Sequence, residues 1–195
     1  GVCQHFIDSG NDPDTTALQM GLFRAVLDAI EAGGVTLPMV HAANSAGATL
    51  RRDATFDLVR IGILAYGVDP YKMAGGALRP VMRWRTRVTA LRQIPAGAGV
   101  SYCSTHRVSR PSVIATLGVG YGDGYPRSLS SKGKVQVRGQ EADVVGLVCM
   151  DQVLIDATDV PGIEIGDEVE LIGPAITVER LAGWANTNVH EIVTR

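Results

Sequence analysis

Two short stretches place polar side chains beside apolar runs of the kind that form buried strands. In "HAANSAG", His41 ends such a run and Ser45 stands where a helix is expected to begin. The hydroxyl of Ser45 and the free N–H groups of a helix N-terminus could hold a phosphate, although serine also serves there as a simple N-cap. In "VRIGIL", Arg60 lies inside an apolar run and is followed by Gly62. A buried arginine requires either an acidic partner or a bound ligand.

Tyrosines on glycine-rich segments form a second set of candidates. "GVGYGDGYPR" carries Tyr121 and Tyr125, and "GVSYCSTH" carries Tyr102. Because glycine lets backbone approach a ligand, these hydroxyls could reach one, but each tyrosine could also cover the edge of a core. Met150 and Asp151 follow in "CMDQ", where Asp151 could also be a turn or capping carboxylate.

A helix signal is strongest near the start of the chain. Asp12 is a plausible N-cap, Pro13 suits the first helical position, and Gly33-Gly34 ends the segment. Apolar residues recur between these limits at helical spacing: Leu18, Leu22, Val26 and Ala29/Ile30. The spacing predicts one long helix.

Strand signals surround this helix. Apolar runs in "GVCQHF", "TLPMVHAA" and "DLVRIGILAYG" predict strands, and "NSAGATLRRDA" predicts a short helix. Alternating strands and helices over about 60 residues are typical of parallel α/β folds, which bind ligands at the carboxyl ends of their strands. The stretch is too short to close a barrel, so we expect the chain to be part of something longer.

From about Gly75-Gly76 the pattern becomes that of antiparallel strands. "MRWRTRVTAL" alternates strictly, with its arginines on one face and mostly apolar residues on the other. Further strands are expected in "PSVIATLGV", "GKVQVRG", "ADVVGLVCMDQVLIDAT" and "DEVELIG", with turns at "IPAGAG", "RGQE" and "IGDE". A helix at Val178–Ala185, with Thr177 as its N-cap, follows them. The second part is therefore predicted to be an all-β module of five or more strands.

Composition narrows the class of protein. The 195 residues are 46% hydrophobic and 19% charged, with a net charge of −2, which is ordinary for a globular protein and gives no reason to expect nucleic acid. No apolar run is long enough to cross a bilayer. The three cysteines, Cys3, Cys103 and Cys149, leave one unpaired under any pairing, so a reduced, cytoplasmic protein is the simplest interpretation. We expect Cys149 to be a buried, inert thiol.

Taken together, six stretches resemble the alanine racemase family in order and spacing: "HAANSAGA", "RIGILAYG", "GVSYCST", "GYGDGYPR", "VVGLVCMDQ" and "GDEVELIG". The resemblance covers essentially the whole chain. It implies a fold that is α/β plus all-β, with residues 1–76 forming the last β/α units of a TIM-type barrel that binds pyridoxal 5'-phosphate. Residues 77–195 would form the C-terminal antiparallel β-domain.

The resemblance also implies roles for the polar residues of the first part. Ser45, with the backbone of Gly62 and Ile63, would cradle the cofactor phosphate, and Arg60 would face the pyridine nitrogen. His5, which could otherwise be an ordinary structural histidine, would hydrogen-bond Tyr102 in a chain that runs through Arg60 to His41. A phenol has a pKa near 10, so such a network would be needed to make Tyr102 a base near neutral pH.

In the second part, the resemblance makes Tyr102 one of two catalytic bases, opposite a lysine. Tyr121 would line the path by which substrate enters, with Tyr125 more suited to packing. Met150 and Asp151 would lie beside the substrate carboxylate. His190 stands where the family usually has a tyrosine that reaches the phosphate, and an imidazole can also donate a hydrogen bond. The family acts as a head-to-tail homodimer with shared active sites.

The implied reaction interconverts L-alanine and D-alanine through a pyridoxal 5'-phosphate aldimine, by two-base transfer of the α-proton, and supplies D-alanine for bacterial peptidoglycan. The family's Schiff-base lysine is absent here, because Lys72, Lys132 and Lys134 match no part of that site. Three alternatives therefore stay open. They are a serine or broad-specificity racemase, a fold-related pyridoxal-phosphate decarboxylase, and a non-catalytic dimerisation or cofactor-binding module.

Overall fold

The computed structural model describes all 195 residues, which divide into two compact units, Gly1–Val81 and Met82–Arg195. Residue 76, the domain boundary expected from sequence, falls in the irregular stretch between the short 3-10 helix η2 (Ile63–Tyr66) and strand β3 (Trp84–Ile94). None of the helices combines the length and apolar character that crossing a bilayer requires.

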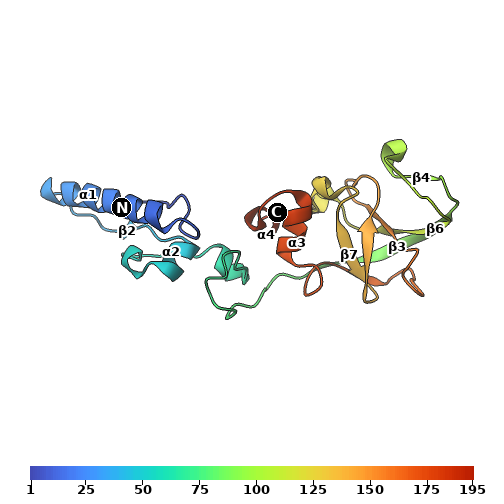
Figure 1. Cartoon of the computed structure of the whole chain (residues 1–195). Helices are drawn as coiled ribbons and strands as arrows, with labels where there is room; N and C mark the ends of the chain where they lie inside the picture. The colour runs from blue at the N-terminus through green and yellow to red at the C-terminus, as the bar shows by residue number, and fades with distance from the viewer. The chain divides into compact units, whose positions relative to one another are not determined.

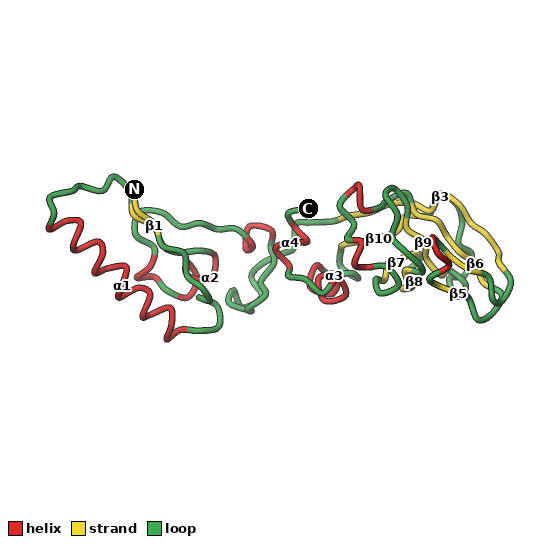
Figure 2. The backbone as a smooth tube through the Cα atoms, turned by 90° about the horizontal axis from the view of Figure 1, so that it is seen from above, coloured by secondary structure: helices red, strands yellow, loops and turns green.

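The first unit contains one long helix and two very short parallel strands (Figure 2). Its elements in chain order are β1 (Val2–Cys3), α1 (Pro13–Ala32), β2 (Val40–His41), α2 (Ser45–Leu50), η1 (Arg52–Ala54) and η2. Its core joins side chains of α1 to the segments that follow the two strands: Phe6, Met20, Phe23, Ala42, Ala43 and Ala54. The α/β character expected for this part is therefore present.

Helix α1 begins and ends where the sequence predicts. The Asp12 side chain accepts a hydrogen bond from the Thr15 N–H at 2.9 Å, Pro13 is the first helical residue, and Gly33 follows the last. The face packed on the core carries Met20 and Phe23. The apolar row at helical spacing faces elsewhere and is half or more exposed in this unit: Leu18, Leu22 and Val26.

Two of the predicted strands differ from the structure. "TLPMVHAA" forms a strand only at Val40–His41. "DLVRIGILAYG" forms none, although it has an isolated bridge between His41 and Leu58, and the Arg60 N–H donates to the Ala43 carbonyl at 2.9 Å. Its second half winds into η2 after Gly62 and stops at Gly67, whose φ of 71° lies in the left-handed region. The two glycines therefore break the run into a bridge and a 3-10 turn.

The second unit is a closed, six-stranded antiparallel barrel (Figure 1). The strands follow the order β10-β3-β6-β9-β8-β7 around it. Apart from β3, their bounds are β6 (Ser112–Leu117), β7 (Lys134–Val137), β8 (Gln140–Val144), β9 (Val153–Asp156) and β10 (Glu168–Ile172). The all-β module expected for the second part is confirmed.

Local patterns within the barrel mostly follow the prediction. The arginines near the start of β3 are exposed and alternate with half-buried or buried residues, as a half-buried strand requires. "RGQE" is the expected tight turn, with Arg138 and Gly139 at φ 48° and 78° between β7 and β8. The long run at 142–158 is not one strand, however. It is interrupted at Gly146, whose φ is 76°, and residues 145–152 form a loop between β8 and β9.

Helices and a small ribbon complete this unit at opposite ends of the barrel (Figure 1). At one end, α3 (Val178–Ala185) is capped by Thr177 as predicted, and Arg180 forms an ion pair with Glu141 of β8. The short helix α4 (Val189–Val193) follows it. At the other end lies the ribbon of β4 (Gly99–Val100) and β5 (His106–Arg107), with the 3-10 turn η3 (Tyr102–Ser104) between them.

Tyr125 is buried in the second unit with a hydroxyl that has no hydrogen-bond partner. Its ring packs edge-on against Trp84 at a centroid distance of 5.9 Å. Burial raises the pKa of the Tyr125 phenol well above its ordinary value, because the charged form would lose its hydration. Tyr125 packs as expected, whereas Tyr121 is exposed.

We expect Tyr125→Phe to raise the free energy of unfolding by about 1 kcal/mol at neutral pH, because it removes a buried polar group that lacks a partner. The pH dependence has a definite sign. The folded phenol keeps its proton above pH 10, where the unfolded one loses it, so Tyr125 lowers stability as the pH rises past about 10. Urea unfolding at pH 7 and pH 11 should show a smaller loss for Tyr125→Phe than for the parent. Equal losses would contradict the buried, neutral phenol.

Candidate functional site

Arg60 lies at the centre of a hydrogen-bonded cluster in the first unit. Its guanidinium bonds the Nδ1 atoms of His41 and, at 3.3 Å, His5. It also donates to the carbonyl oxygens of Gln4 and Ala42, both at 3.0 Å. No carboxylate pairs with it anywhere in the chain, so the acidic partner considered from sequence is not found. The cluster keeps one positive charge.

The contact with Arg60 sets the tautomer of His41. A guanidinium only donates, so the Nδ1 of His41 accepts, which places its ring proton on Nε2. The Nε–H of Arg60 makes no hydrogen bond within the chain, which leaves a charged donor available to a ligand. The first unit therefore holds a permanently protonated donor flanked by two imidazoles.

Two helix starts are joined beside this cluster. Ser45 is buried, and its Oγ accepts a hydrogen bond from the Gly62 N–H at 3.0 Å. Ser45 opens α2, and Ile63 opens η2. The first N–H groups of a helix have no partner within it and attract anions. The hydroxyl proton of Ser45 makes no hydrogen bond in the structure, so it too is available.

Ser45 is not the N-cap that the sequence suggested. Asn44 caps α2, because its Oδ1 accepts from the Gly47 N–H at 2.9 Å and from the Ser9 hydroxyl at 2.7 Å. An Asn-Ser pair offers two possible caps, and the asparagine takes the role through its contact with Ser9, which is distant in sequence. The Ser45 hydroxyl is thereby released from capping. A Cβ at Gly62 would meet nothing within 4 Å, so the space beside the cradle is open.

Three loops of the second unit carry the remaining candidates. Tyr102 begins η3 and is 70% exposed. Tyr121 begins the 3-10 turn η4 (Tyr121–Asp123), and its N–H donates to the Cys149 carbonyl at 2.9 Å. The Gly122 N–H donates to the carbonyl of Met150 at 2.8 Å, which ties the tyrosine loop to the loop at 145–152.

Gly120 is required at the contact between these loops. A Cβ on Gly120 would lie 2.3 Å from the Met150 carbonyl oxygen and 2.4 Å from that of Cys149. The Met150 and Asp151 side chains are exposed beside it. Cys149 is half-buried rather than buried, with its Sγ 3.5 Å from the Leu147 carbonyl. The loop at 145–152 is thus more exposed to solvent than its apolar sequence predicted.

The structure brings some predicted site residues together and leaves others apart. His5, His41 and Arg60 form one cluster, and Ser45 meets Gly62. Tyr102, Tyr121, Met150 and Asp151 belong to the second unit, as does His190, which is exposed on α4. No group of three or more histidine, cysteine, aspartate or glutamate side chains is arranged to hold a metal ion.

Comparison with known proteins covers both units. The family described as "Alanine racemase, N-terminal domain" matches residues 1–70, and "Alanine racemase, C-terminal domain" matches residues 81–195. The alanine racemase of Halothermothrix orenii is 41% identical over 200 residues, covering 99% of this chain and 53% of the relative. That of Salinispora arenicola is 42% identical and covers 100% and 54%. This chain spans about half the length of these relatives.

Solved structures agree with the sequence matches. Alanine racemase from Bartonella henselae with covalently bound pyridoxal phosphate superposes with a TM-score of 0.88 at 37% identity, covering 99% of this chain and 53% of that one. The enzyme of D-cycloserine-producing Streptomyces lavendulae gives 0.91 at 35% identity, covering 100% and 53%. Both units thus have the fold of the corresponding half of such proteins.

Proposed function

We propose that this chain, which belongs to the alanine racemase family, forms the C-terminal half of a pyridoxal-phosphate-dependent enzyme that interconverts L-alanine and D-alanine. The observation that carries the proposal is the cationic, carboxylate-free arrangement of Arg60 beside two joined helix starts. It offers an anion cradle and a permanent hydrogen-bond donor next to each other. Since relatives are about twice as long, we assign the Schiff-base lysine to a segment outside this chain.

The residues of the first unit fit the cofactor. The free Ser45 hydroxyl proton and the backbone N–H of Ile63 suit a phosphate, and the open space at Gly62 leaves room for it. Arg60, with its unused Nε–H, suits the pyridine nitrogen. When bound, pyridoxal phosphate supplies an electron-withdrawing ring that makes the α-C–H of an attached amino acid acidic.

Arg60 sets how the α-proton is returned. Because a guanidinium keeps its protons at any working pH, Arg60 would donate to the ring nitrogen without transferring a proton to it. Arg60 would thereby limit electron withdrawal by the ring, which would favour return of the proton to the α-carbon over transfer of the amino group to the cofactor. His41 and the carbonyls of Gln4 and Ala42 hold the guanidinium in place.

We assign Tyr102 as one of two bases, with its phenol oxygen taking or giving the α-proton on the face opposite the lysine. With its Nδ1 turned toward Arg60, the His5 ring leaves its Nε2 side for that oxygen, and we assign it to hydrogen-bond the phenol there. Because Tyr102 and His5 belong to different units, we propose that they meet between subunits of a head-to-tail homodimer. We assign Tyr121 to the path of the substrate, Met150 and Asp151 to its carboxylate, and His190 to the phosphate.

The substrate alanine and the supply of D-alanine for peptidoglycan are part of this proposal, and the three free cysteines favour a reducing, cytoplasmic setting. A serine or broad-specificity racemase would differ from an alanine racemase only by small changes in the substrate pocket. Such changes discriminate weakly between substrates that differ by one hydroxyl or methylene. A decarboxylase of related fold would be expected to present an acidic residue to the pyridine nitrogen, and Arg60 disfavours it.

The proposal is tested by completing the chain. We would fuse it behind the N-terminal half of the Halothermothrix orenii relative, add pyridoxal phosphate, and follow D-alanine formation from L-alanine; this fusion is called the completed enzyme below. Racemisation is expected, and mass spectrometry after borohydride reduction should find a pyridoxyl adduct on a lysine outside this chain. A folded, cofactor-loaded protein without turnover would favour the non-catalytic module. An adduct on Lys72, Lys132 or Lys134 would contradict the site.

Ser45→Ala in the completed enzyme is expected to weaken pyridoxal phosphate binding about tenfold, because one donor to the phosphate is lost and the Gly62 N–H loses its partner. Cofactor titration by absorbance measures the change. Thr49→Ala is the matched control, since its hydroxyl only bonds back to the Ser45 carbonyl within α2. An equal effect of both substitutions would mean that helix stability, and not phosphate contact, is being measured.

A further inference from the structure

The turn that carries Tyr102 has an unusual backbone. Ser101 has φ 64° and ψ −175°, a combination that is adopted almost only by glycine. Cys103 and Ser104 also have positive φ, at 59° and 47°. Three non-glycine residues in such conformations within four positions must be held by their surroundings, because each is disfavoured by contact between its Cβ and the backbone.

The contact that holds the turn comes from the loop between β8 and β9. The Ser101 hydroxyl donates to the Leu147 carbonyl at 2.9 Å. Gly146 packs directly on Ser101, and a Cβ at this glycine would lie 2.4 Å from the serine Cβ. Gly146 is itself fixed, since its N–H donates to the Ser131 hydroxyl at 3.0 Å.

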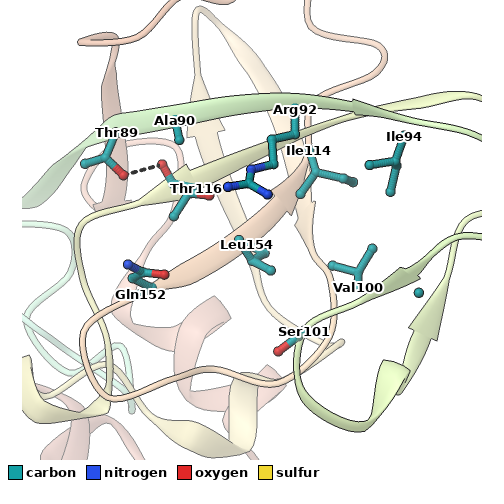
Figure 3. A pocket seen from close by; sticks show the side chains of 11 residues that line it. Thr89, Ala90, Arg92, Ile94, Val100, Ser101, Ile114, Thr116, Gln152 and Leu154 are labelled. Carbon is teal, nitrogen blue, oxygen red and sulfur yellow. Dashed lines mark hydrogen bonds between the residues drawn. The ribbon is translucent and has the colours of Figure 1, made fainter.

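Elsewhere the turn packs within its own ribbon, where the Ser104 side chain lies against Gly99. A cavity of about 570 Å³ lies between Val100 and Ser101 on one side and the barrel wall on the other, where Ile114, Leu154 and Gln152 line it (Figure 3). Tyr102, Cys103 and Ser104 are exposed, and their side chains make no hydrogen bonds. Ser101 is thus the residue of this turn whose side chain ties it to the barrel.

The same loop also positions the second tyrosine. Its carbonyls at Cys149 and Met150 accept from the N–H groups of Tyr121 and Gly122. Leu147 to Met150 therefore forms one frame that holds the Tyr102 turn through a side-chain contact and the Tyr121 loop through backbone contacts. A shift of this frame would move both phenols together.

We propose that Ser101 is a positioning residue for Tyr102, and that the strained turn it holds against Gly146 and Leu147 fixes where the phenol oxygen lies. This inference rests on the proposed function, in which Tyr102 exchanges the α-proton. The strain at Ser101 then accompanies the presentation of an exposed tyrosine in one direction. A turn without the Ser101 contact would still fold, but it would not hold the phenol oxygen of Tyr102 in one position.

The test compares Ser101→Gly with Ser104→Gly in the completed enzyme. Both replace a serine of the same turn at positive φ and add the same freedom to the unfolded chain, while Ser101→Gly also relieves the greater backbone strain. Only Ser101 donates to the barrel. We expect Ser101→Gly to lower kcat at least tenfold with little change in KM, because small misplacements of a reacting group are costly. Ser104→Gly should stay within twofold of the parent.

Two further measurements separate positioning from structure. The melting temperatures of the two variants should agree within a few degrees. The isotope effect with α-deuterated alanine should rise for Ser101→Gly in the direction in which Tyr102 removes the proton, and less in the other. An unchanged kcat, or unfolding of Ser101→Gly alone, would overturn the inference. A parent enzyme without racemase activity would instead overturn the proposed function.

Discussion

Replacing Arg60 with glutamate is expected to lower kcat/KM for racemisation by about 10²- to 10³-fold, and to raise the fraction of turnovers that end in pyruvate. A carboxylic acid can share its proton with the pyridine nitrogen, whereas the guanidinium cannot. The restraint on transfer of the amino group to the cofactor would thus be removed, and each pyruvate would leave one cofactor in the pyridoxamine form. The measurement is the ratio of pyruvate to D-alanine formed from L-alanine by the completed enzyme.

This substitution also disturbs the cluster around it, because a carboxylate would face the carbonyls of Gln4 and Ala42. Arg60→Lys is therefore the matched control, since it keeps the positive charge but loses the planar guanidinium with its several N–H donors. It should lose activity without a rise in pyruvate. If Arg60→Glu folds, binds the cofactor and leaves the product ratio unchanged, the assignment of Arg60 to the pyridine nitrogen is wrong.

Replacing Tyr102 with phenylalanine is expected to lower kcat by about 10²- to 10⁴-fold, the range that a positioned acid–base group contributes. The change should hardly affect folding, because Tyr102 is 70% exposed and its hydroxyl has no partner within this chain. Initial rates in both directions, with the melting temperature alongside, measure the effect.

Tyr121→Phe is the matched control for this prediction. Tyr121 is a second exposed phenol of the same unit, and its loop is held through its backbone, so loss of the hydroxyl should change KM more than kcat. If Tyr102→Phe lowered kcat by less than threefold, or no more than Tyr121→Phe, another group would have to be the base.

Features that depend on neighbours in sequence could be predicted. The bounds of α1 follow from Asp12, Pro13 and Gly33, and those of α3 from Thr177, because a cap acts within one helical turn. The alternation of β3 likewise follows from residues two apart. These signals act between residues that are close in sequence, so they do not depend on tertiary contacts.

Features that depend on distant contacts could not be predicted from the residues alone. Arg60 meets His5 across 55 positions, and only the fold, or a resemblance to a known family, brings them together. Asn44, and not Ser45, is the N-cap of α2, because the Ser9 hydroxyl contacts the Asn44 side chain. The role of Ser101 has no signal in sequence, since a serine with positive φ looks like any other serine.

Closure of the six-stranded barrel separates the framework of this unit from its chemistry. Every strand of the barrel has two hydrogen-bonded neighbours, so none of these strands leaves an edge to be protected by the loops. The residues of this unit assigned to proton transfer and substrate contact, by contrast, all lie in turns at 101–104, 118–127 and 145–152. Substitutions in these turns that keep Gly120, Gly146 and Ser101 are therefore expected to leave the strand register unaltered. In engineering terms, the barrel is a scaffold on which the turns can be varied without rebuilding the sheet.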